Sequence, residues 1–367
     1  MAWFLAFIFL FAAPVWGTPA HAAPPIKIGA ILDLSGPGFR KGQIYQFMAQ
    51  KAVETVNQRG GIRGRPLKLI VVDDQGLVRR SLILAQRLIS AEGVVALIGP
   101  SNPRAEMALR RLADREKIPL ILISGDGPLF RQPAQPFTYN FKVGPALPPA
   151  VKALYRYLKS QGFQKIGLLL PSSRSGKKAL IWLRAYAAEF HLKVVAREWF
   201  SPGDTDVETQ LRHLDSQGAQ AIVSWAEPKA LATVVNSWQG KGLPPLFLGY
   251  QAASLSFTPR LLPPEVKATW PRFVLQPEDL DGRFLLALKE LGRPPEYFSA
   301  TAWDAIMLLA KGLNRSGANK KALRWVLENL DTIELISGTY RLDRNDHYGL
   351  RPESFIITGL IEGNLVR

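Results

Sequence analysis

The order of short apolar segments and amphipathic segments is the feature that most limits the fold of this chain. Residues 26–32 (IKIGAIL) are typical of a buried strand, and a helical spacing of apolar residues follows them as far as Gly60–Gly61. Further strand-like runs lie at 67–72, 94–98 and 118–123, and further helical patterns at 79–91 and from Asn102–Pro103. Apolar strands that alternate with amphipathic helices predict a parallel sheet covered by helices on both faces.

The same alternation resumes after a proline-rich stretch at 137–149. Strands are predicted at 165–170, 193–199, 221–225 and 246–248, and helices at 177–189, 207–216 and 228–239. A chain of 367 residues suits two domains better than one core. We therefore predict an α/β protein with two doubly wound parallel-sheet lobes joined by a hinge.

The first 22 residues have the pattern of a signal peptide. Residues 1–16 are almost entirely apolar, and Ala20-His21-Ala22 offers a small-x-small cleavage pattern, so we expect cleavage after Ala22 and localisation in the periplasm. No Lys or Arg precedes the apolar run, which leaves a retained membrane anchor as the alternative, but the run is short for a span. No later segment is long and apolar enough to predict a transmembrane helix in the mature chain.

Composition argues against several other classes of protein. The formal net charge is +16, but basic pairs such as Arg79-Arg80 and Lys177-Lys178 are scattered, whereas a nucleic-acid-binding protein gathers its charge in one stripe. We expect a solvated surface, with an anionic membrane as an alternative partner, and no binding of nucleic acid. The absence of cysteine excludes thiol catalysis, thiolate metal sites and disulfides.

No arrangement of residues predicts catalysis. The histidines of the mature chain, His191, His213 and His347, are far apart in sequence and lack metal-ligand spacing. The glycines of residues 36–42 come close to a dinucleotide-binding loop, but the third glycine falls one place late. We therefore expect no enzyme, no cofactor and no metal, with an NAD-dependent enzyme as a remote alternative.

Ligands of such sheets bind at the carboxyl ends of the strands. The candidate ligand-binding residues there are Ser35, Phe39, Ser101, Asn102, Ser124, Gly125, Asp126, Trp225, Tyr250 and Gln251. Asn102 is a suitable N-cap, and a helix starting there would favour an anionic ligand group. Asp126 suits a ligand cation and Trp225 an apolar or cationic group, but a turn and core packing explain these two equally well.

Several stretches of the chain resemble the type I periplasmic binding proteins, and among them the branched-chain amino-acid (Leu/Ile/Val-type) receptors of ABC importers. The resemblance lies in IKIGAILDLSGP (26–37), AVETVNQRGGIRGRPLKLIVVDDQG (52–76), GVVALIGP (93–100), ATAWDAIMLLAKGLNRSG (300–317) and ISGTYRLDRNDHYGLRPESFIITGLIEG (336–363). It implies a monomer that closes on a small amino-acid-like or related polar or anionic ligand and delivers it to an ABC transporter permease.

The resemblance also implies how the chain divides into lobes. The N-terminal lobe would hold residues 23–141 plus 276–335, and the C-terminal lobe residues 142–275 plus 336–367, so that three segments cross between them.

Three positions depart from the family's usual binding residues. Pro103 stands where the family has Ser, Asp126 where it has Thr, and Gln251 where it has an acid. These departures leave open a non-amino-acid ligand, such as an amide, an aromatic acid or an apolar metabolite. They also leave open a role as a sensor or as a partner of another envelope protein.

Overall fold

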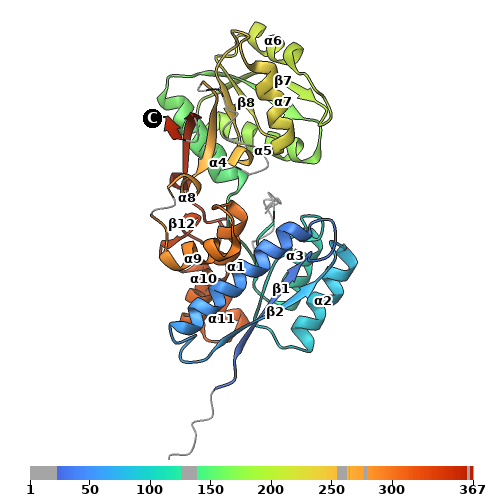
Figure 1. The fold of residues 1–367 in the computed structure, drawn as a ribbon, viewed down its shortest axis with the longest axis vertical. Helices are drawn as coiled ribbons and strands as arrows, with labels where there is room; N and C mark the ends of the chain where they lie inside the picture. Colours follow the sequence, from blue (N-terminus) through green and yellow to red (C-terminus); the bar gives the residue numbers. More distant parts are fainter. Residues whose placement is uncertain are drawn as a thin grey trace, which may run out of the picture.

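The chain forms two lobes that lie one above the other along the longest axis of the molecule (Figure 1). The computed structural model describes residues 23–124, 139–253, 263, 265–276, 279–361 and 364–366. Each lobe is built on its own mainly parallel sheet with helices packed against it. The predicted α/β class with two parallel-sheet lobes is therefore confirmed.

The first lobe contains a sheet of five parallel strands in the order β2-β1-β3-β4-β5. The strands are β1 (Ile26–Leu32), β2 (Leu67–Asp73), β3 (Ala96–Ile98), β4 (Leu120–Leu122) and β5 (Asn140–Lys142). Helix α1 (Phe39–Gln58) covers one face of this sheet, and α2 (Val78–Ser90) and α3 (Glu106–Glu116) cover the other. Successive side chains of a strand point to opposite faces. Accordingly, Ala30 belongs to the core under α1, while Ile31 packs with Leu88 of α2.

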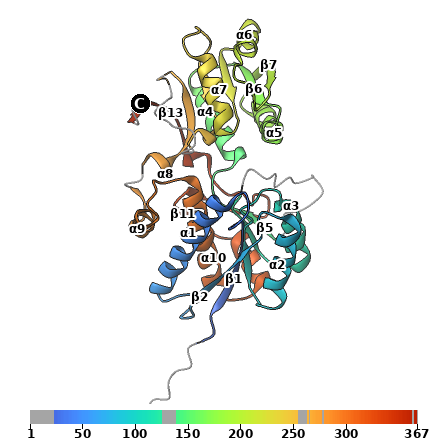
Figure 2. The same cartoon turned by 45° about the vertical axis from the view of Figure 1, so that its right-hand side comes forward.

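Three helices from late in the sequence complete this lobe. Helices α9 (Gly282–Leu291), α10 (Tyr297–Ser316) and α11 (Lys320–Glu328) lie on the α1 side of the sheet (Figures 1 and 2). The rings of Tyr45 in α1 and Phe298 in α10 meet edge to face with centroids 6.1 Å apart. Lys51 in α1 also forms an ion pair of 2.6 Å with Glu290 in α9. Segments more than 200 residues apart thus share one core.

The second lobe contains a seven-stranded sheet in the order β14-β13-β10-β9-β8-β6-β7. Its parallel strands are β6 (Lys165–Pro171), β7 (Lys193–Phe200), β8 (Ala221–Ser224), β9 (Leu246–Leu248) and β10 (Lys267–Pro271). Two antiparallel strands, β13 (Phe355–Ile361) and β14 (Asn364–Val366), extend it. Its helices are α4 (Leu147–Ser160), α5 (Arg174–Glu189), α6 (Glu208–Ser216) and α7 (Pro228–Trp238).

Short elements lie near the junction of the two lobes. They are the 3-10 helix η1 (Tyr250–Ala253), helix α8 (Arg272–Leu275), the hairpin of β11 (Ile333–Leu335) and β12 (Gly338–Tyr340), and the 3-10 helix η4 (Pro352–Ser354). Figure 1 places α8 and β12 between the upper and lower lobes.

Two local predictions are wrong. The proline-rich stretch 137–149 does not interrupt the pattern, because it contains β5 and the first turn of α4, where proline is tolerated since the N–H groups there have no helical partner. Helix α3 begins at Glu106, not at Asn102. The Asn102 side chain instead accepts a hydrogen bond from Arg104 N at 3.0 Å and donates one to Gly76 O at 2.5 Å, so it joins two loops.

Candidate functional site

A cavity of about 290 Å³ lies between the two lobes. From the first lobe and the connection after β5 it is lined by Pro103, Ile123, Lys142, Pro145, Tyr297 and Thr301. From the second lobe it is lined by Leu147, Arg174, Ser175, Lys178, Trp225, Ala226, Glu227, Tyr250 and Gln251. Most of these residues follow the carboxyl end of a strand or open a helix, which is where open α/β sheets bind ligands.

Three aromatic rings form one wall of the cavity and connect the two lobes. Trp225 follows β8 and meets Tyr250 of η1 edge to face, with centroids 6.0 Å apart. Tyr250 in turn meets Tyr297, the first residue of α10, at 6.1 Å in the same geometry. Edge-to-face contacts of this kind add about 0.5–1.5 kcal/mol to the burial of the rings. The wall therefore offers a rigid apolar surface.

The charged side chains of the cavity wall are mostly cations. Lys142, Arg174 and Lys178 line it, and among the described lining residues Glu227 is the only carboxylate. Lys142 is 2% exposed, and its Nζ donates to the carbonyl of Val143 at 3.1 Å. Glu227, by contrast, is exposed. The described wall therefore carries net positive charge.

The N-terminus of helix α5 adds to this positive field. Helix α5 begins at Arg174 with Ser173 as its N-cap, and no acidic residue lies in its first turn. The first turns of α4 and α10 also reach the cavity, but Pro148 and Pro149 lack N–H groups and Glu296 is the N-cap of α10. The free N–H groups at a helix N-terminus carry a partial positive charge and attract anions.

Three polar atoms at this junction are buried without a hydrogen-bond partner among the described residues: Ser124 Oγ, next to the cavity-lining Ile123, and Ser224 Oγ and Trp225 Nε1 at the end of β8. A buried donor left unpaired costs about 1–3 kcal/mol. Such atoms therefore require a specific reason, and a binding site whose partners arrive with a ligand supplies one.

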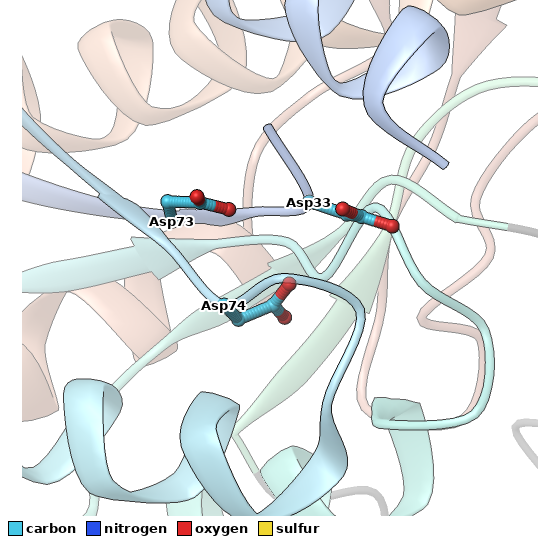
Figure 3. Close-up of side chains that lie close together, drawn as sticks. All are labelled: Asp33, Asp73 and Asp74. Atoms are coloured by element: carbon cyan, nitrogen blue, oxygen red, sulfur yellow. The ribbon is translucent and has the colours of Figure 1, made fainter. Parts of the chain in front are cut away.

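Three carboxylates lie close together at the carboxyl ends of β1 and β2 (Figure 3). Asp33, Asp73 and Asp74 each have an oxygen within 4.8 Å of an oxygen of the other two, the spacing of a cation site. However, the oxygens already accept hydrogen bonds from the surrounding loops. Their donors are Gly36 N and Gly38 N for Asp33, Leu34 N, Gln75 N and Ser35 Oγ for Asp73, and Gly76 N and Ser81 Oγ for Asp74.

The pKa values of the cluster agree with a structural role. Burial raises the pKa of Asp74. Burial also acts upward on the pKa of Asp73, but hydrogen bonds from Ser35, Leu34 and Gln75 outweigh it and leave that pKa below its ordinary value. The cluster therefore shapes the loop after β1.

Trp225, Tyr250 and Gln251 are the predicted site residues that line the cavity. Trp225 is 2% exposed and belongs to the hydrophobic core, so core packing is observed. Its contact with a ligand stays a prediction. Ser124 directly follows the lining residue Ile123. Gly125 and Asp126 lie outside the described residues.

The remaining predicted residues do not line this cavity. The hydroxyl of Ser35 donates to Asp73 at 2.5 Å, and the hydroxyl of Ser101 accepts from Asp33 N at 2.7 Å. Phe39 is 40% exposed, with the Arg40 guanidinium 5.9 Å from its ring. These side chains, like Asn102, hold or border the loops of the first lobe.

Sequence reasoning missed several lining residues. Lys142 lies in β5, inside the stretch that was taken for a break in the pattern. Arg174 and Lys178 open α5 just after β6, at a strand end from which no candidate residue was chosen. Tyr297 and Thr301 lie in α10, which follows other helices and not a strand of its own lobe. The rule that ligands bind at strand ends could therefore not find them.

This fold and cavity define a two-lobed protein with a cavity for a small molecule between its lobes. The chain belongs to the family described as periplasmic binding protein, whose model matches residues 25–356. The resemblance noted in the sequence is thereby confirmed.

Its relatives include an "Amino acid binding protein" of Pseudomonas aeruginosa, 22% identical over 91% of this chain and 90% of the relative. A second relative is the "Leu/Ile/Val-binding protein homolog 3" of Brucella melitensis, 23% identical over 97% of this chain and 96% of the relative.

Solved structures share the fold. A putative branched-chain amino acid ABC transporter protein from Rhodospirillum rubrum has a TM-score of 0.78 at 18% identity, over 93% of this chain and 99% of that one. The branched-chain amino acid transporter substrate-binding protein of Streptococcus pneumoniae, in complex with isoleucine, has a TM-score of 0.71 at 20% identity. The match covers 94% of this chain and 98% of that one. In the part of the present chain that the structure describes, no helix combines the length and apolar character needed to cross a membrane.

Proposed function

We propose that this chain is the substrate-binding subunit of an ABC importer, exported to the periplasm through a signal peptide that is cleaved after Ala22. It captures a small polar or anionic ligand between its lobes without transforming it, and presents the ligand to the permease as a monomer. The observation that carries this proposal is the cavity lined from both lobes, with Tyr297 on one side and Arg174 and Trp225 on the other.

The proposed mechanism is hinge closure. The lobes comprise residues 23–141 plus 276–335 and residues 142–275 plus 336–367, so three segments connect them. A ligand that touches both lobes has its full set of contacts only when they are closed, and it therefore shifts the population toward the closed state. The name of one relative mentions Leu, Ile and Val, and that of the other mentions amino acids in general. Both names support a transport role but come from chains only 22–23% identical.

The test is a ligand screen of the mature chain, which begins at Ala23, with two readouts. Thermal unfolding is measured against amino acids, amides, organic acids and apolar metabolites. A ligand at about 100 times its Kd adds about 2.7 kcal/mol to the free energy of unfolding. Small-angle scattering then compares the free and the saturated protein. We expect a smaller radius of gyration with ligand. A bound ligand that leaves the radius unchanged argues against hinge closure, and the absence of any ligand argues against the whole proposal.

A further inference from the structure

We infer that the ligand of this cavity is a small organic acid with a flat aromatic body and no ammonium group. Its carboxylate lies among Arg174, Lys178 and Lys142, and its ring lies against Tyr250, Tyr297 and Trp225. This inference rests on the proposed function, because it names the class of molecule that the same cavity takes.

The charge of the wall is the first argument. Closure removes water from around Arg174 and Lys178, and moving a charge out of water is costly unless a counter-charge comes with it. An anion offsets that cost by pairing with them. A zwitterionic α-amino acid has no net charge and also needs an acceptor for its ammonium. Glu227 is the only carboxylate among the described lining residues, against the three cations Lys142, Arg174 and Lys178.

The geometry of α5 is the second argument. Arg174 and Lys178 are four residues apart, so they lie on one face of the helix, and both line the cavity. Lys177 lies on the same helix and is not a lining residue. Arg174 is also the first residue of a helix that has no acid in its first turn. A guanidinium beside free N–H groups suits the two oxygens of a carboxylate.

The aromatic wall is the third argument, and it indicates the body of the ligand. Trp225, Tyr250 and Tyr297 form a continuous edge-to-face series that spans the two lobes. Flat aromatic groups pack on such faces in offset or edge contacts. The volume of about 290 Å³ is at the small end for ligand cavities. Gln251 adds an amide, whose NH₂ can donate to a carboxylate.

The first experiment is calorimetric titration of the mature chain with a matched set of probes. The probes are 3-phenylpropanoate, L-phenylalanine, which adds only the α-ammonium, and 3-phenylpropanamide, which removes the charge. Benzoate and benzamide form a second matched pair. We expect one of the two acids to bind about tenfold or more tightly than its uncharged or zwitterionic partners, because a hydrogen bond to a charged group contributes about 1.5–3 kcal/mol.

The second experiment uses variants of α5. Arg174→Gln and Lys178→Gln each weaken binding of the acid by about tenfold or more, since each removes one charge-assisted contact. Lys177→Gln is the matched control and leaves affinity unchanged. Unchanged thermal midpoints of the free variants show that each of them folds. Lys142 is buried, so the test does not depend on a variant at that position.

The outcomes separate this inference from the proposed function. Binding of L-phenylalanine or an amide at least as tightly as the acids overturns the inference, yet supports the proposed function if the radius of gyration falls. Equal effects of Lys177→Gln and Lys178→Gln also overturn it. If the acids fail to bind while another compound of the wider screen causes compaction, only the inference falls. If no compound binds, both fall.

Discussion

The carboxylate of Asp304, in the middle of α10, accepts a hydrogen bond of 2.8 Å from the backbone N–H of Ser337, in the turn between β11 and β12. The hydroxyl of Ser337 also donates to Asp304 and lies 2.7 Å from the hydroxyl of Tyr340. Tyr340 in turn accepts from Gly144 N at 2.7 Å, in the connection between β5 and α4. This chain of hydrogen bonds ties two of the proposed connecting segments to the first lobe.

The first prediction concerns the pH dependence of stability. Burial raises the pKa of Asp304 to about 6, although hydrogen bonds from Ser337 and Ile336 act in the opposite direction. The folded chain therefore holds this proton more tightly than the unfolded chain, where the ordinary value is 3.8. The contribution of Asp304 to the free energy of unfolding is fully present below about pH 3.8. It is lost as the pH rises through about 6.

Urea unfolding between pH 4 and pH 7.5 measures this contribution, which amounts to about 3 kcal/mol at most. We expect the Asp304→Asn variant to lack this contribution. The change in its free energy of unfolding between the two pH values should therefore differ by that amount from the change in the unmodified chain. Asp331→Asn, at an exposed position, serves as the control and keeps the slope of the unmodified chain. Identical pH slopes for the unmodified chain and Asp304→Asn are incompatible with this account.

The second prediction concerns Gly144. Its φ of +84° is a left-handed conformation, and a Cβ there would overlap the hydroxyl of Thr301 on α10. Gly162 has nearly the same φ, +82°, but open space around it. Both Gly→Ala changes carry the left-handed backbone cost of about 1–2 kcal/mol, and only Gly144→Ala adds the clash.

We therefore expect the thermal midpoint to fall more for Gly144→Ala than for Gly162→Ala. The double variant Gly144→Ala with Thr301→Ala tests the cause directly, because it removes the group that the new methyl meets. After the effect of Thr301→Ala alone is subtracted, the thermal midpoint of the double variant should be higher than that of Gly144→Ala. No regain would mean that the clash is not what limits the substitution.

Much of the fold could be predicted from sequence because its strands are local and apolar throughout. The predicted strand at 246–248 coincides with β9, and the helix predicted at 79–91 is shifted by one residue from α2. Strand β13 lies in the stretch 336–363, which was singled out only through the family resemblance, and β14 follows that stretch. The pairing of β13 with β10 joins residues 84 to 90 positions apart, which a local pattern does not encode.

The site was less predictable for a related reason. Trp225, Tyr250 and Gln251 follow strand ends, so the rule for open α/β sheets located them. Lys142 and Tyr297 reach the cavity only because distant segments fold together, and no periodicity marks them. Conversely, Ser35 lies in the expected loop, but its hydroxyl bonds to Asp73, a partner 38 residues away.

The third prediction concerns the acidic cluster of Asp33, Asp73 and Asp74. Since its oxygens accept hydrogen bonds from loop N–H groups and hydroxyls, divalent cations have to displace those donors to bind. We expect millimolar Ca²⁺ or Mg²⁺, or EDTA, to leave the thermal midpoint unchanged. We expect Asp33→Ala to lower it, because two backbone donors lose their acceptor. A midpoint that rises with Ca²⁺ in the unmodified chain and not in Asp33→Ala would instead identify a cation site.

The last prediction separates the two roles of Trp225. Its ring packs in the core, while its Nε1 is buried with no hydrogen-bond partner among the described residues. Trp225→Phe keeps an aromatic ring and removes the unpaired donor. The gain from removing that donor offsets part of the packing loss, so the free energy of unfolding of the free protein should change less than in Trp225→Ala, which costs about 3–5 kcal/mol.

Ligand affinity should respond differently to the same change. If the ligand accepts a hydrogen bond from Nε1, Trp225→Phe weakens binding by about tenfold, while the stability of the free protein is largely kept. Titration calorimetry and urea unfolding of the same preparation measure the two quantities together. Unchanged affinity in Trp225→Phe, alongside a marked loss in Trp225→Ala, would assign the contribution of Trp225 to its ring and leave Nε1 without a role in binding.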